Sequence, residues 1–301
     1  MRTRIISALR RLLRRAPEPA RFASVSEYWN HHNVTHHRSF ATADESLENF
    51  HWRNSQYANY LALMPVSGFD GCRVLDYGCG PGHDLVGFGV YSKPAKLAGA
   101  DVSASSIREA RTRLALHGIK AELHRIEPGE QLPFDDAAFD HVHSSGVLHH
   151  VEDPIATLSE LKRVLRRGGS MNVMVYNFDS VWTHLFVAYH RAIVAGRYVD
   201  LPLREQFARS TDGEACPISR CYRPDEFIEL ARAAGFDVTF AGAAVSLHEL
   251  SLLATRFEAI MDPRLPDESR RFLESLEFDG HLWPVTGGRH AGVDGIYHLR
   301  H

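Results

Sequence analysis

Residues 74–84 read VLDYGCGPGHD, and this stretch decides the fold. An apolar run ends at Asp76, and three glycines follow at alternate positions, Gly78, Gly80 and Gly82. An apolar strand, a glycine-rich turn and a helix in this order are typical of the first unit of a ligand-binding α/β fold. Because glycine adopts backbone conformations that other residues avoid, such a turn lets the main chain approach a bound molecule closely.

Strands and helices alternate along the chain after this turn. The expected strands are 73–78, 95–102, 121–126, 139–145 and 170–177. The expected helices are 85–92, one opened by a capping box at Ser106 to Glu109 and running to Gly118, 156–167 up to Gly168, and the first half of 224–242. Such alternation predicts an α/β fold with a doubly wound, mostly parallel sheet that carries helices on both faces.

We expect one domain over residues 23–301, preceded by a basic amphipathic tail and linker at 1–22. Its expected parts are a helical cap at 23–70, a ligand-binding core at 71–176, an aromatic-rich insertion that serves as a lid at 177–222, and the C-terminal part of the fold at 223–301.

Composition excludes several classes of protein. The 34 basic and 37 acidic residues give a net charge of −3, so bulk charge does not indicate a nucleic-acid partner. The four cysteines form no C-x-x-C pair, and no run of 18 apolar residues occurs. We therefore expect a cytoplasmic protein with no membrane span.

The glycine turn is a poor site for a phosphate. The segment 76–85 contains two acids and no lysine or arginine, and no GK[ST] follows. Dinucleotide loops read G-x-G-x-x-G, whereas the third glycine here comes one residue early. S-adenosylmethionine carries a sulfonium and an ammonium, so Asp76 would attract it. Asp101 ends the next strand, where a carboxylate accepts ribose hydroxyls, and Val102 would pack on the adenine.

These motifs resemble the class I S-adenosylmethionine-dependent methyltransferases over about residues 71–176. The matching segments are DYGCGPG, Asp101, LPFDDAAFDHVHSSGVLHHVEDP and LKRVLRRGG. The subset with GxGxD and GVLHH, which resembles bacterial small-molecule methyltransferases, is the most similar. The resemblance implies a Rossmann-like fold, S-adenosylmethionine as cofactor and a small-molecule acceptor. It also implies Ser144 beside the methionine part of the cofactor.

One position departs from the family pattern. Relatives carry an acid before LPF that meets the adenine amino group, whereas Pro128 stands there in this chain. Glu127, one position earlier, is the expected substitute.

The expected reaction is methyl transfer to an acceptor, with a hydroxyl oxygen favoured. A hydroxyl nucleophile needs a base, and His149, at the ligand-facing end of the 139–145 strand, is our candidate. The alternative for His149 is packing beneath the loop. The strand ends in SSGV rather than an NPPY-type sequence, which argues against nucleic acid as the acceptor. Two other functions stay open: a nucleotide-dependent oxidoreductase and a non-catalytic binding protein.

A histidine cluster, HHNVTHH, occupies residues 31–37. His32 and His36 are four residues apart, a spacing that in a helix places two potential metal ligands on one face. No acid completes a ligand set before Asp44, so we interpret the cluster as a polar cap segment and expect no metal.

The first 15 residues, MRTRIISALRRLLRR, contain six arginines, no acid and an apolar helical stripe. The pattern predicts peripheral contact with anionic membranes; a solvated tail and a transit peptide are the alternatives. We predict that deleting residues 1–15 reduces pelleting with anionic vesicles at low salt and leaves ligand binding intact. Equal pelleting of the full and shortened chains would exclude the membrane interpretation.

Overall fold

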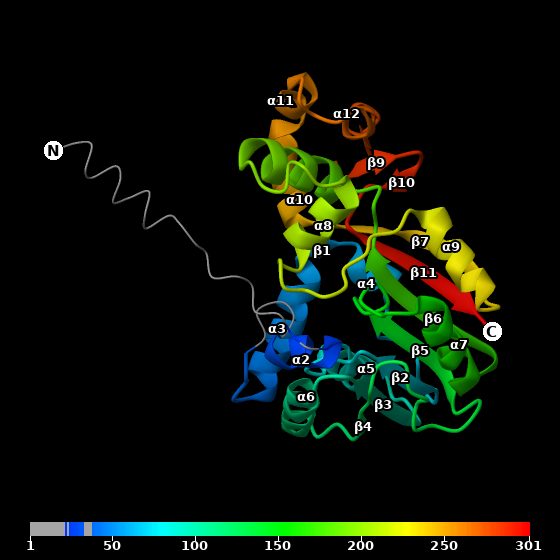
Figure 1. Ribbon diagram of the computed structural model, residues 1–301. Helices are drawn as coiled ribbons and strands as arrows, with labels where there is room; N and C mark the ends of the chain where they lie inside the picture. Colours follow the sequence, from blue (N-terminus) through cyan, green and yellow to red (C-terminus); the bar gives the residue numbers. More distant parts are fainter. Residues whose placement is uncertain (1–21, 23, 33–37) are drawn as a thin grey trace.

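A computed structural model describes residues 22, 24–32 and 38–301 (Figure 1). The expectations for residues 1–15 and for His36 lie outside the described residues. Within them, no helix is both long and apolar enough to cross a membrane.

The core is one sheet of eight strands in the order β1-β7-β11-β6-β5-β2-β3-β4. The strands are β1 (Tyr57–Ala58), β2 (Arg73–Tyr77), β3 (Lys96–Asp101), β4 (Glu122–Arg125), β5 (Phe139–Ser145), β6 (Leu165–Tyr176), β7 (Asp237–Ser246) and β11 (Asp294–Arg300). The run from β4 to β6 is parallel, and β11 lies antiparallel between β6 and β7. The expected doubly wound, mostly parallel sheet is confirmed.

Helices cover both faces of this sheet because alternate residues of each strand point to opposite sides. On β2, Val74 packs with α3 (Ala43–Ser55), α5 (His83–Tyr91) and α6 (Ala104–Leu116). The next residue, Leu75, packs on the other side with α7 (Pro154–Val164) and α9 (Pro224–Ala233). Both side chains are fully buried, as expected for a strand in the middle of a parallel sheet.

The insertion between β6 and α9 contains a π-helix, η1 (Trp182–Val194), and α8 (Leu203–Thr211). A second group of elements packs on η1: α10 (Leu247–Leu252), η2 (Leu253–Thr255), α11 (Arg256–Met261) and α12 (Asp267–Glu274). A small sheet follows, made of β8 (Glu277–Phe278), β9 (Pro284–Thr286) and β10 (Arg289–His290). Leu185 and Tyr189 of η1 share an apolar cluster with Ala259 and Leu273. Residues 247–290 therefore extend the insertion, which the sequence patterns did not predict.

The N-terminal cap consists of α2 (Val25–His31), α3 and α4 (Tyr60–Leu63). The cap is not entirely helical, because β1 lies between α3 and α4 and pairs with β7. Asn59 follows in the left-handed region, with φ of 63°, and turns the chain into α4.

Two expected helix boundaries are wrong. Ser103, not Ser106, caps α6, because its hydroxyl accepts the Ser106 backbone N–H. The helix before β6 ends at Val164, not at Gly168, because the buried Leu165 adopts an extended conformation and pairs with Phe139.

Gly292, just before β11, has no room for a side chain. A Cβ there would collide with the carbonyl of Ala244, which is backbone of the neighbouring strand. We predict that Gly292→Ala destabilises the fold by about 2–3 kcal/mol, measured by denaturant unfolding. Gly280→Ala is the matched control, because its Cβ would meet open space. Equal stability of the two variants would contradict this packing.

Candidate active site

The glycine turn joins β2 to α5 at the carboxyl edge of the sheet. Gly78, Gly80 and Gly82 have φ values of 75°, 51° and 79°, a region that side chains disfavour. A Cβ on Gly78 would collide with Val147, and one on Gly82 would lie 3.1 Å from the Ala110 Cβ. A Cβ on Gly80 would meet open space, so this residue presents bare backbone to the cavity that it lines.

Asp101, the last residue of β3, holds this turn in place. Its Oδ2 accepts the Gly80 N–H and its Oδ1 accepts the Ser103 N–H, both at 2.8 Å. Burial raises the pKa of the carboxyl, while these two hydrogen bonds oppose that shift. Asp101 lines the cavity together with Val102.

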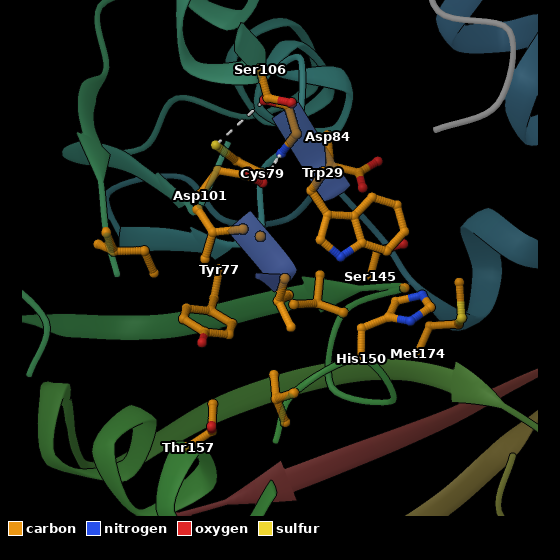
Figure 2. Close-up of a pocket in the computed structure, with 18 of the residues that line it drawn as sticks. Trp29, Tyr77, Cys79, Asp84, Asp101, Ser106, Ser145, His150, Thr157 and Met174 are labelled. Atoms are coloured by element: carbon orange, nitrogen blue, oxygen red, sulfur yellow. Dashed lines mark hydrogen bonds between the residues drawn. The ribbon is translucent and has the colours of Figure 1, made fainter. Parts of the chain in front are cut away.

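The cavity has a volume of about 340 Å³ and extends from this loop to the cap. Figure 2 shows Tyr77 and Thr157 on one side, and Trp29, His150 and Met174 on the other. We name the first side the loop end and the second the cap end.

Two acids, Glu127 and Glu130, line the part of the cavity where the sequence predicts a contact with adenine. Glu127 lines the loop end, but its carboxylate already pairs with Arg125. Glu130 lines the same wall beyond the turn at Pro128 and Gly129. Both Glu127, which the sequence singled out, and Glu130, which it did not, therefore line the cavity.

Asp76 does not line the cavity, which corrects the expectation that it faces the ligand. It is 2% exposed, and its Oδ2 has no hydrogen-bond partner among the described residues. The alternation of β2 directs it to the same face as Val74, beneath α5. Burial raises the pKa of Asp76 to about 7, although His143 opposes the shift.

Asp84, in the first turn of α5, is the acid that lines the wall. Its Oδ1 lies 3.4 Å from Nη1 of Arg53, and its Oδ2 lies 3.5 Å from Nε2 of His143. Arg53 and His143 hold the pKa of Asp84 well below its usual value, although burial on its own would raise it.

Ser144 and His149 also fall outside the cavity wall. Ser144 is fully buried, and its Oγ has no hydrogen-bond partner among the residues that the structure describes. Ser145 lines the cavity instead, and its hydroxyl is hydrogen-bonded to that of Tyr60. His149 is fully buried, and its ring stacks on Tyr176 with centroids 3.8 Å apart. Burial lowers the pKa of His149 far below the usual value, and the ring packs beneath the loop rather than in the cavity wall.

His150 is the histidine at the cap end. Its Nδ1–H donates to the Ile218 carbonyl over 2.6 Å, which leaves Nε2 as the acceptor nitrogen of the neutral ring. Nε2 lies 4.0 Å from Oδ2 of Asp212. The Trp29 ring lies against His150, with centroids 4.8 Å apart. Burial lowers the pKa of His150, and Asp212 opposes the shift.

Asp212 is fixed by three contacts. Its Oδ1 accepts the hydroxyl of Tyr176 at 2.8 Å, and its Oδ2 accepts that of Ser219 at 2.7 Å. Its backbone carbonyl accepts the hydroxyl of Tyr28 at 2.8 Å, which ties α2 to the insertion. His150, Asp212 and Cys216 present potential metal ligand atoms within 4.8 Å of one another, but both Asp212 oxygens already accept hydrogen bonds.

Residues of the N-terminal cap also line the cavity. Trp29, Arg53 and Tyr57 line the cap end, and His32 of the histidine cluster lies at its rim. Asp294, from the first position of β11, lines it as well. No sequence motif marked Asp294.

Comparison with known proteins identifies the domain. Residues 69–201 match a family described as methyltransferase domain. An uncharacterised methyltransferase of Schizosaccharomyces pombe is 36% identical over 39% of this chain and 44% of its own length. The chain spans less than half the length of this relative and of two uncharacterised relatives, from Streptomyces fradiae and a Synechococcus strain.

A ubiquinone biosynthesis O-methyltransferase of Cereibacter sphaeroides is 26% identical over 73% of this chain and 82% of its own length. Among solved structures, a putative methyltransferase complexed with the Haloferax volcanii activator Trm112 superimposes with a TM-score of 0.52. It is 22% identical and the match covers 86% of this chain and 94% of that one, which shows a shared fold. Residues 69–201 therefore match a methyltransferase domain, and the sheet that contains them has the fold of a solved putative methyltransferase.

Proposed function

We propose that the protein transfers a methyl group from S-adenosylmethionine to a hydroxyl oxygen of a small molecule. The observation that carries the choice of oxygen is His150, a neutral, oriented imidazole that lines the same cavity as the glycine turn. Relatives named ubiquinone biosynthesis O-methyltransferase support the same choice.

The loop end fits this cofactor. Gly80 offers bare backbone, Asp101 keeps lone pairs for the ribose hydroxyls, and Val102 gives the adenine an apolar contact. Asp84 supplies the negative charge that a sulfonium and an ammonium favour, the role first expected of Asp76. Arg53 makes one long hydrogen bond to Asp84, so its other N–H groups are available to the cofactor carboxylate.

The chain's own contribution is positioning and proton transfer. The bound cofactor supplies an electrophilic methyl group and a thioether leaving group. Nε2 of His150 takes the proton of the acceptor hydroxyl while Nδ1–H stays on the Ile218 carbonyl. The Asp212 carboxylate, 4.0 Å away, stabilises the imidazolium that results.

Water exclusion depends on the cap. Val25, Trp29 and His32 cover one side of the cavity from α2 and the residue after it. We propose that residues 23–70 act as the cap and 177–222 as the lid of one domain over 23–301. The hydrogen bond from Tyr28 to Asp212 supports joint closure of the two. Peripheral membrane contact through residues 1–15 also belongs to this proposal.

The two alternative functions have less support. A nucleotide-dependent oxidoreductase needs a site for a pyrophosphate. The turn has G-x-G-x-G rather than G-x-G-x-x-G spacing, and the negative charge of Asp84 beside it disfavours a pyrophosphate. A non-catalytic binding protein would have no use for an oriented base beside the cofactor loop.

We predict that Asp101→Ala weakens binding of S-adenosylhomocysteine about 10- to 100-fold, or about 1.5–3 kcal/mol. The variant loses both the ribose acceptor and the bond that fixes Gly80. Asp140→Ala is the control, because Asp140 lies at the opposite end of β5 and pairs with Arg73. Unchanged affinity of the Asp101 variant in calorimetry would overturn the cofactor site.

We predict that His150→Gln slows the chemical step by about 10²- to 10⁴-fold without changing cofactor affinity. The wild-type rate should fall as pH drops through the pKa of His150, which burial places below the usual 6.5. The variant should lose that inflection. His149→Gln is the matched control and should keep both rate and inflection per folded molecule. Single-turnover rates across pH test this, and an inflection that follows His149 would refute the assignment.

A further inference from the structure

Asp294 is a buried acid in the cavity wall that the proposed reaction does not use. It opens β11, opposite Tyr176 of β6 and Ala244 of β7, and it is 3% exposed. It lines the cap end of the same cavity as His150.

No hydrogen bond and no ion pair within 4.0 Å reaches the Asp294 carboxyl from the residues that the structure describes. Arg53, a cation that lines this part of the cavity, donates a hydrogen bond to Asp84 instead. Behind Asp294 lies Glu249 of α10, fully buried, whose carboxylate accepts hydrogen bonds from Ser246, Trp182 and Val293. The described residues therefore make no hydrogen bond to the Asp294 carboxyl, which is available to bind a ligand in the cavity.

We propose that Asp294 recognises the acceptor, donating a hydrogen bond as an un-ionised carboxylic acid to an oxygen of an uncharged molecule. This inference rests on the proposed function and names the class of acceptor. The acceptor carries one oxygen that is methylated near His150 and a second oxygen that is held by Asp294.

The surroundings of Asp294 favour its protonated form. A buried carboxylate without a cationic partner costs several kcal/mol, and protonation avoids that cost. The groups that face Asp294 are Arg53 from α3, Tyr57 from β1, Tyr60 from α4, Tyr176 from β6 and Glu249 from α10. Burial raises the pKa of Asp294 to about 8, Glu249 adds to the shift, and Arg53 opposes it.

The same wall disfavours charged acceptors. An acceptor carboxylate would lie near the ionised Asp84, which already pairs with Arg53, and an ammonium group would gain no charge from an un-ionised Asp294. Five aromatic or apolar residues also line the cavity: Trp29, Tyr57, Tyr60, Met174 and Tyr176. A planar hydroxylated ring stacks on such a surface and carries the two oxygens.

The test uses the full chain saturated with S-adenosylhomocysteine and four probes. Catechol, resorcinol and hydroquinone place a second hydroxyl at three distances from the first, and phenol is the single-hydroxyl control. We expect wild type at pH 7 to bind at least one of the three about tenfold more tightly than phenol in calorimetry. Asp294→Ala should lose that advantage and keep its affinity for phenol, whereas Asp294→Asn, which still donates a hydrogen bond, should restore it.

The pH dependence distinguishes the un-ionised acid from a carboxylate. The wild-type advantage should fall as pH rises through about 8, and Asp294→Asn should keep its advantage to pH 9. Glu249→Gln removes a negative charge that raises the pKa of Asp294. This variant should therefore lose its preference for the two-oxygen probe at a lower pH than wild type does. Melting curves and affinity for S-adenosylhomocysteine report whether each variant is folded.

Three results would overturn the inference: no two-oxygen probe preferred over phenol, an advantage that grows with pH, or an Asn variant no better than Ala. Failure of the proposed function would be seen in different measurements. The protein would then not bind S-adenosylhomocysteine, or its rate of methyl transfer would not change when His150 is replaced.

Discussion

The Asp101 carboxylate is the contact on which the site depends. One oxygen holds the Gly80 N–H and the other holds the Ser103 N–H, so a single side chain joins the glycine turn after β2 to the start of α6. Both partners are backbone groups, which fixes the position of the main chain itself. The positive φ values of the turn cost little at glycine, and the hydrogen bond to Gly80 selects one conformation from those that glycine allows.

Beneath this turn lies a line of alternating charge. Arg53, Asp84, His143 and Asp76 follow one another from the cavity wall into the core, and burial magnifies each interaction. Asp84 stays ionised because it has cationic groups on two sides. Asp76 is two residues from the first glycine, but burial and the nearby acids Asp84 and Asp101 raise its pKa against the opposing effect of His143 and Arg53. Proximity to the turn in sequence therefore did not decide which acid lines the cavity.

The sequence predicted the parts of the site that depend on local order. A strand, a glycine turn and a helix position Gly80, and the end of the next strand positions Asp101, because parallel strands share one carboxyl edge. It could not choose between His149 and His150, or between Ser144 and Ser145. Those choices depend on which neighbour packs below the loop, here Tyr176 against His149. Asp212 and Asp294 reach the cavity from segments far along the chain, and no local pattern relates them to the turn.

Helix α2 has a consequence for the timing of the reaction. It covers the cavity at Trp29, and it is held by Tyr28 on Asp212 at one side and by Ser105 on the Asn30 carbonyl at the other. A ligand that passes beneath it must break both hydrogen bonds and expose the indole to water. For the proposed methyl transfer, turnover would then depend on how fast this helix lifts, and substitutions at Tyr28 or Ser105 would change the rate of product release without touching a reacting atom.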